Sequence, residues 1–372
     1  MDNGSVKKFG WDIQRLINGF DLTRERSYGM FKEVLLDQQS ELQQGAFLAA
    51  LTAKGETSEE IAGAWEAIDE FDTVHTAAPF VGPLVENSGT GMDQLKTFNV
   101  SSAAAIIAAA GGVRIARHGA RALTSRCGAV DILEAVGIDV ECDVSIVEKS
   151  IKEAKIGIFN GMSPQIHPKA LFRILSQIRF GSTLNIAASL ANPARPDHAV
   201  RGVYSQELMP KVCKVMKETG YKRGMVLYGY DGNKDKGMDE VSVLGETAVL
   251  EFFPDGREHS FTVVPEDAGI KRREYADIAP LGNIKEEALR FVRVIEGKGH
   301  GACVDFACIN AAAIFSVAGK AKTLKEGAEM AREIIENGKA AMKLEEWIKS
   351  QNRDKDAGLS RYKELLSLSR IS

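Results

Sequence analysis

Apolar and polar positions follow a helical period in the first part of the chain. Apolar residues recur at this spacing in Trp11–Asn18, Thr23–Leu36, Gln43–Thr52 and Ser58–Phe71, which predicts four helices. Two of these helices open near a threonine followed by acids, in DLTRE and ETSEE, a pattern typical of a helix N-terminus. The sequence therefore predicts an all-helical domain over residues 1–75.

The pattern changes near residue 75, where the stretch TAAPFVGPLVENSG interrupts the helices. Short β-type runs then alternate with helices, which is typical of a parallel sheet with crossover connections. Residues 169–190 again have a helical pattern, and we expect this segment to pack onto the N-terminal helices. The predicted fold class is therefore α/β, a small all-helical N-terminal domain plus a larger α/β domain over residues 76–372, with a mostly parallel central sheet flanked by helices. The β-type runs are Val113–Ala116, Ile156–Phe159, Gly224–Tyr228 and Ala248–Phe253.

Composition and charge exclude several classes of protein. The 372 residues are 44% hydrophobic and 26% charged, which is ordinary for a globular chain. A formal net charge of −4 disfavours a nucleic-acid binder, and the longest apolar run, AAAIIAAAGGV, is too short to span a membrane. The N-terminus lacks the apolar run of a secretory signal, and the five cysteines are odd in number without a CxxC spacing. We therefore expect a cytoplasmic protein with reduced thiols and a small-molecule partner.

A glycine-rich turn precedes the apolar helix predicted at Ala103–Ala110. Gly89-Thr90-Gly91-Met92-Asp93 is followed by Thr97-Phe98-Asn99-Val100-Ser101-Ser102. Backbone N–H groups at a helix N-terminus bind anionic oxygens, because the unpaired donors and the helix dipole both favour negative charge. The spacing matches neither GxGxxG nor the P-loop, and glycine turns are common. The turn is thus a candidate anion site, without a nucleotide motif.

Two further clusters carry candidate chemistry. Arg117 to Arg121, followed by Thr124 and Ser125, comes after a predicted strand, where α/β proteins place ligand sites. The alternative is that the arginines are surface cations and His118 caps a helix. Asp239 and Glu240 stand side by side, and such a pair either solvates a loop or supplies the carboxylate oxygens that Mg²⁺ prefers.

Four motifs in the same order give the chain a family resemblance over nearly its whole length. SGTGMD stands for GTGGD, TFNVSS for TFNxST, RHGARALTSRCGAVDILEAVG for KHGNRxxSSxxGxADxLExLG, and GMDE for an Asp-Glu pair. The chain resembles the anthranilate phosphoribosyltransferase family, which is related to the pyrimidine nucleoside phosphorylases. The resemblance implies a Mg²⁺-dependent transfer of phosphoribosyl from phosphoribosyl pyrophosphate to an aromatic or heterocyclic acceptor, and a homodimer formed through the helical domain.

The same resemblance assigns roles to individual residues. It implies metal ligation by Ser101, Asp239 and Glu240, and places Arg117 and His118 with the two acids in the catalytic centre. The residues implied to bind phosphoribosyl pyrophosphate are Gly89, Thr90, Gly91, Asp93, Thr97, Asn99, Ser101, Ser102, Arg117 and Ser125.

The acceptor half departs from the family pattern. Ala120 replaces an asparagine that contacts anthranilate, and Gln177 falls where the family has an arginine for the anthranilate carboxylate, in a segment two residues shorter. The residues implied to bind the acceptor are Ala120, His167, Gln177 and Arg179, with Arg173 as another substitute cation. Met92 also replaces a glycine of the donor loop. The predicted acceptor is anthranilate or a related aromatic amine, and the alternatives are a nucleoside phosphorylase-like enzyme or a non-catalytic paralogue that binds nucleic acid or a protein.

Overall fold

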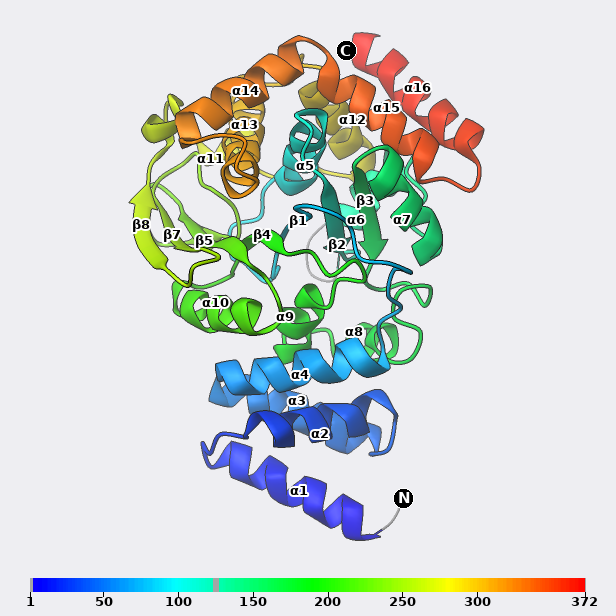
Figure 1. Ribbon diagram of the computed structural model, residues 1–372, viewed down its shortest axis with the longest axis vertical. Helices are drawn as coiled ribbons and strands as arrows, with labels where there is room; N and C mark the ends of the chain where they lie inside the picture. The colour runs from blue at the N-terminus through cyan, green and yellow to red at the C-terminus, as the bar shows by residue number, and fades with distance from the viewer. Residues whose placement is uncertain (1–2, 123–126, 372) are drawn as a thin grey trace.

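The computed structural model describes residues 3–122 and 127–371, and it has a helical N-terminal part below a larger α/β part (Figure 1). The side chains of Thr23 and Thr57 accept backbone N–H groups at the starts of α2 and α4, so both predicted caps are confirmed. Gly55 ends α3 with φ +86°, a conformation that favours glycine. The four helices are α1 Asn3–Ile17, α2 Arg24–Leu35, α3 Glu41–Lys54 and α4 Ser58–Phe71.

Residues 169–190, predicted to be helical, form two helices, α8 Leu171–Ile178 and α9 Thr183–Leu190. The chain turns at Arg179, whose φ of +47° is left-handed, and Ser182 stands as the N-cap of α9. Asp72 accepts three backbone N–H groups at the start of α8, which holds this helix against the end of α4. Apolar residues of α8 and α9 share one core with α1 to α4.

The sheet has the strand order β3-β2-β1-β4-β5-β7-β8, with β6 paired to β5. The first five strands of this order are parallel, and β7 and β8 continue it antiparallel. The predicted fold class is confirmed, although only four of the strands were expected. The strands are β1 Val85–Gly89, β2 Ile115–Gly119, β3 Ile156–Asn160, β4 His198–Gly202, β5 Arg223–Tyr230, β6 Gly237–Met238, β7 Thr247–Phe252 and β8 Glu258–Val263.

Helices cover both faces of the sheet (Figure 1). The apolar helix α5 Val100–Ala110 is buried almost all round, because its small alanines let α13 and α15 pack closely against it. The Ala/Ile run therefore serves as the centre of the main core. The remaining helices are α6 Ala129–Ala135, α7 Val144–Glu153, α10 Met209–Glu218, α11 Tyr275–Ile278, α12 Ile284–Ile295, α13 Gly301–Val317, α14 Leu324–Glu336, α15 Lys339–Ser350, α16 Lys355–Ile371 and the 3₁₀ turns Gln206–Leu208 and Pro265–Ala268.

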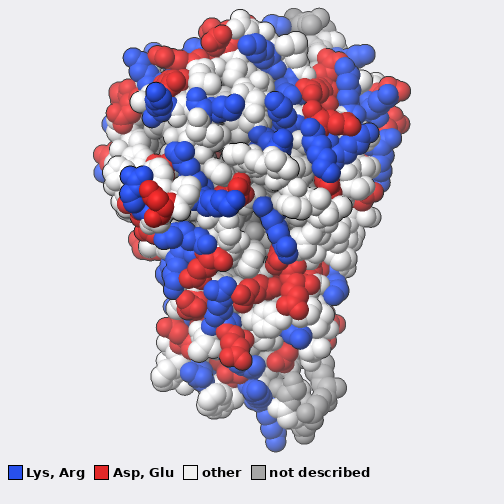
Figure 2. All heavy atoms as spheres, viewed as in Figure 1, with Lys and Arg blue, Asp and Glu red and all other residues white. Residues whose placement is uncertain are grey.

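Basic and acidic side chains are interspersed over the face drawn in Figure 2. All five cysteines are free thiols, and four of them are buried. In the part of the chain that the structure describes, no helix has the length and apolar character needed to cross a bilayer.

Candidate active site

A cavity of about 300 Å³ opens at the carboxyl ends of β1, β2 and β3. The parallel register places Gly89 beside Gly202 and Gly119 beside Asn160, so the turns after these strands meet at one edge of the sheet. Residues of the α8–α9 turn close the cavity from the side of the helical domain. The site therefore lies between the two parts of the molecule, where open α/β sheets bind ligands.

The glycine loop is built around Asp239. The backbone N–H of Gly91 donates to Asp239 Oδ2 over 2.9 Å, and that of Thr90 to the carbonyl of Gly202 over 3.0 Å. A Cβ on Gly89 would lie 1.9 Å from Asp239 Oδ2. The two acids and the glycine loop, which are far apart in the sequence, therefore form one unit.

Three carboxylates, those of Asp93, Asp239 and Glu240, line the cavity beside the glycine loop. Burial, and then the neighbouring Asp93, raise the pKa of Asp239 to about 7. Burial and Asp239 raise the pKa of Glu240 well above its usual value, although the Ser101 hydroxyl donates to both oxygens of Glu240 over 2.8 and 2.9 Å. Lys96 Nζ lies 2.6 Å from Asp93. The carboxylates repel one another when ionised, and a bound cation would relieve that repulsion.

Asp239, Glu240 and Ser101 fit a magnesium ion by their chemistry, since hard oxygen ligands are what Mg²⁺ requires. Within residues 3–122 and 127–371, no group of three or more His, Cys, Asp or Glu side chains is arranged as a complete metal site. Mg²⁺ usually binds through one or two carboxylates together with water and substrate phosphates. A donor phosphate would therefore have to complete the coordination shell.

Arg117 lies at the floor of the cavity and is almost fully buried. Its Nη1 donates to Ser102 Oγ over 2.5 Å, and its Nε to the carbonyl of Asn87 over 3.3 Å. Ser102 in turn donates to Asn99 Oδ1. Burial lowers the pKa of Arg117 to about 10, opposed by Glu240 and Glu86, so the guanidinium stays charged at neutral pH.

His118 and His167 form a buried pair whose Nε2 atoms lie 3.0 Å apart. His167 Nδ1 lies 2.5 Å from the carbonyl of Asp72, so we assign the ring proton of His167 to Nδ1 and that of His118 to Nε2. Burial, together with the proximity of His167, lowers the pKa of His118 well below its usual value, and burial lowers that of His167 to about 4. Both rings are therefore neutral at pH 7. His118 lines the cavity and His167 lies behind it.

The other end of the cavity is mainly apolar, with Ala120, Met162, Leu175 and Phe180 in its wall. Arg179 also lines it, and its guanidinium donates to the carbonyl of Ser176 without a carboxylate partner among the described residues.

Two other polar residues of α8 do not reach this wall. Gln177 is exposed outside the lining, and Arg173 points to the helical domain, where it donates to Gln44 and to the carbonyl of Val34.

Most of the residues predicted from the sequence come together. Ser102 lies beneath Arg117 rather than in the lining, and Ser125 lies outside the described residues. Sequence reasoning missed Lys96, although it is the one basic residue between the motifs SGTGMD and TFNVSS and could have been found on that ground. It also missed Leu175 and Phe180, which belong to no motif. The predicted residues that line the cavity are Gly89, Thr90, Gly91, Asp93, Thr97, Asn99, Ser101, Arg117, His118, Ala120, Arg179, Asp239 and Glu240.

Comparison with known proteins extends these observations. The model of the glycosyl transferase family a/b domain matches residues 81–341, and that of the family's helical bundle domain matches residues 13–71. The chain is 34% identical to an anthranilate phosphoribosyltransferase of Lacticaseibacillus paracasei, over 92% of this chain and 98% of the relative. It is 38% identical to one of Haloarcula marismortui, over 90% and 98%.

Solved structures show the same similarity. The anthranilate phosphoribosyltransferase of Thermus thermophilus superposes with a TM-score of 0.77 at 31% identity, covering 95% of this chain and 99% of the other. A variant of the Saccharomyces cerevisiae enzyme with Mg bound gives a TM-score of 0.75 at 25% identity, covering 91% and 94%. The yeast enzyme in complex with 4-fluoroanthranilate gives 0.74 at 25% identity, again covering 91% and 94%.

Proposed function

This chain belongs to the anthranilate phosphoribosyltransferase family, and from that premise we propose that it transfers 5-phosphoribosyl from phosphoribosyl pyrophosphate to the amine of anthranilate. Pyrophosphate is released, and in a cell the step would belong to tryptophan biosynthesis. The observation that carries the proposal is the unit formed by the glycine loop, Ser101 and the pair Asp239 and Glu240, with the buried Arg117 in the same cavity.

In the reaction, the bond from ribose C1 to the pyrophosphate oxygen breaks, a bond from C1 to the amine nitrogen forms, and the amine passes a proton to the released pyrophosphate or to water. Negative charge grows on the departing oxygen. Arg117 and Lys96 are placed to stabilise that charge. Mg²⁺ held by Asp239, Glu240 and Ser101 would neutralise pyrophosphate charge when bound.

The nucleophile is a neutral amine, so the reaction does not require a strong base. The neutral ring of His118, held by His167, suits an orienting role beside the acceptor. The apolar wall of Met162, Leu175 and Phe180 suits an aromatic ring, and Arg179 is a lining cation without a carboxylate partner among the described residues, so it can meet an acceptor carboxylate. We therefore propose Arg179 for the role that an arginine in α8 has in the family pattern.

We also propose that the protein is a cytoplasmic homodimer. The five free thiols are typical of a reducing compartment. Large apolar side chains are exposed on the helical domain, with Trp11 62% and Leu42 87% exposed, and Ile17 and Phe20 lie exposed as well. Several exposed apolar side chains on one small domain are typical of an interface.

Calorimetric titration with phosphoribosyl pyrophosphate, with and without Mg²⁺, tests the donor half, and pyrophosphate release on adding anthranilate tests the acceptor half. We expect Mg²⁺-dependent binding and release. Binding without release would redirect the search to other aromatic acceptors, and absence of binding would refute the transferase assignment.

The variant Asp239→Asn with Glu240→Gln should lose Mg²⁺-dependent donor binding and at least about 100-fold of turnover, because it removes the charge that holds the metal. The matched control is Asp255→Asn with Glu258→Gln, which changes two exposed acids at the β7–β8 hairpin. Equal activity in the two double variants would contradict the metal assignment.

A further inference from the structure

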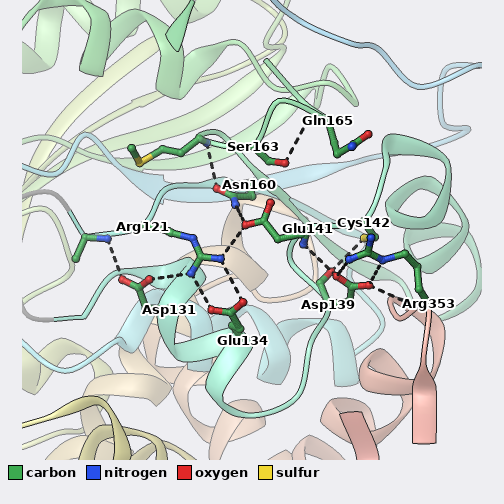
Figure 3. Close-up of polar contacts among 12 residues, drawn as sticks. Arg121, Asp131, Glu134, Asp139, Glu141, Cys142, Asn160, Ser163, Gln165 and Arg353 are labelled. Carbon is green, nitrogen blue, oxygen red and sulfur yellow. Dashed lines mark hydrogen bonds and ion pairs between the residues drawn. The ribbon is translucent and has the colours of Figure 1, made fainter. Parts of the chain in front are cut away.

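Arg121 lines the cavity but is already committed to three carboxylates (Figure 3). Its guanidinium lies 3.3 Å from Asp131, 2.8 Å from Glu134 and 2.7 Å from Glu141. Hydrogen bonding to Glu134, together with Glu141 and Asp131, outweighs burial and raises the pKa of Arg121. Three carboxylates around one guanidinium disfavour the binding of a phosphate to it. Arg121 therefore serves as a structural link rather than a phosphate ligand.

Glu141 joins two turns that border the cavity. Its Oε1 accepts from Arg121 Nη2 over 2.7 Å and from Asn160 Nδ2 over 2.8 Å. Arg121 belongs to the turn after β2, and Asn160 is the buried last residue of β3. Asn160 Oδ1 accepts the backbone N–H of Met162, which lines the acceptor end. A single carboxylate oxygen therefore connects the turn that carries Ala120 with the turn that carries Met162.

The segment that carries Glu141 is also held by the connection between α15 and α16. Both carboxylate oxygens of Asp139 accept from Arg353, over 2.6 and 3.0 Å, and the backbone N–H of Asp139 donates to the carbonyl of Gln351. Asp139 Oδ1 also accepts the backbone N–H of Glu141. The backbone next to Glu141 is therefore held by Asp139, and the contacts of the Glu141 side chain to Arg121 and Asn160 can set the positions of the two turns (Figure 3).

We propose that Glu141 is a positioning residue of the transferase reaction, which sets the spacing between the Ala120 turn and the Met162 turn and thereby the width of the acceptor end. The inference rests on the proposed function. It predicts that loss of Glu141 changes the acceptor KM more than the free energy of unfolding. The Glu141 side chain is 40% exposed, and exposed ion pairs add little to stability. Small displacements of a wall that holds the substrate lower the reaction rate much more.

The chain offers a closely matched control in Glu134. Its side chain is 41% exposed, contacts the same guanidinium as Glu141, and makes no hydrogen bond or ion pair to the β3 turn among the described residues. The experiment compares Glu141→Ala, Glu141→Gln and Glu134→Ala for donor KM, acceptor KM and kcat. We expect Glu141→Ala to raise acceptor KM roughly ten-fold with a smaller change in donor KM. Glu141→Gln should stay within about three-fold of the parent, because the amide oxygen still accepts both hydrogen bonds, and so should Glu134→Ala.

A second measurement does not depend on turnover. Hydrogen exchange of the Met162 backbone amide should be faster in Glu141→Ala than in the parent protein and unchanged in Glu134→Ala. Unchanged exchange at Met162, or equal kinetic effects of the two alanine variants, would overturn the proposal. Failure of the parent protein to release pyrophosphate would instead count against the proposed function, and the exchange result would still decide the role of Glu141.

Discussion

Met92 shows how one side chain can join the two halves of the site. It occupies a left-handed backbone position, with φ +66°, where the family pattern has a glycine. Its side chain lies against Gly181 in the α8–α9 turn, since a Cβ on Gly181 would lie 1.8 Å from Met92 Sδ. The donor loop therefore touches the acceptor wall through this thioether.

We expect Met92→Gly to raise acceptor KM several-fold and to leave donor KM nearly unchanged, because the contacts of Gly91 with Asp239 remain. Relief of the left-handed backbone, about 1 kcal/mol, should offset part of the lost packing, so the melting temperature should change little. Steady-state kinetics and thermal unfolding measure both effects. Lys234→Gly, at an exposed position with φ +63°, controls for the backbone change, and a larger effect on donor than on acceptor KM would contradict the expectation.

At Arg179, loss of the charge should weaken binding of an acceptor carboxylate. We expect Arg179→Gln to raise acceptor KM by about ten-fold or more for anthranilate, with donor KM unaffected, because a charge-assisted bond to a carboxylate is worth about 1.5–3 kcal/mol. Arg173→Gln is the control, because Arg173 donates to the helical domain instead. If Arg179→Gln changes the KM for aniline, which lacks the carboxylate, as much as the KM for anthranilate, another residue binds the carboxylate.

The sequence identified the donor half of the site more fully than the acceptor half. Motif order located the glycine loop, Asp239 and Glu240, because their chemistry requires those residue types. Motif order could not show which of Arg173, Gln177 and Arg179 faces the acceptor, because the directions of their side chains depend on where α8 ends. That end is set by a left-handed residue and a nearby cap, neither of which a hydrophobic pattern contains.

At the scale of elements, regular patterns predicted helices well and central strands poorly. The strands VENSG and HAVRG carry Glu86 and Arg201, which are charged residues that usually argue against a buried strand. In the structure they form a fully buried ion pair at 2.7 Å, and Tyr221 and Asn192 also donate to Glu86. A buried charge is tolerated when such partners are present, and sequence alone does not reveal partners so distant along the chain.

Asp197 links the starts of two of these strands. Burial alone would raise its pKa, but hydrogen bonds from His198 and from the backbone N–H of Leu84 outweigh burial and lower the pKa to about 2. A lowered carboxyl pKa gives stability that is present above the usual value near 4 and is lost as the pH falls towards 2. We expect Asp197→Asn to destabilise the protein by about 1 kcal/mol at pH 7 and by clearly less at pH 3, as measured by urea unfolding. The exposed Asp235→Asn should show no such pH-dependent difference.

At the scale of the whole molecule, the exposed apolar residues of α1 and α3 predict association. Leu42→Asp should convert the proposed dimer to a monomer, because a charge would be buried without a partner at the interface. Light scattering after size-exclusion chromatography measures the mass directly. Met342→Asp on α15, which is 63% exposed in the other part of the molecule, should leave the mass unchanged. A parent protein that runs as a monomer would refute the assembly.

The fit between Asp239 and the two glycines constrains how this protein can change over evolutionary time. A side chain on Gly89 would meet the Asp239 carboxylate, and one on Gly202 would lie 1.7 Å from the Asp239 carbonyl oxygen. Substitutions at Gly89 and Asp239 are therefore not independent, whereas Gly202 faces a backbone atom that every residue at position 239 keeps. A lineage that abandons the reaction would have to lose or displace the Asp239 side chain before Gly89 could change, and Gly202 would stay restricted after that loss, so the glycines would outlast the acid as a record of the former activity.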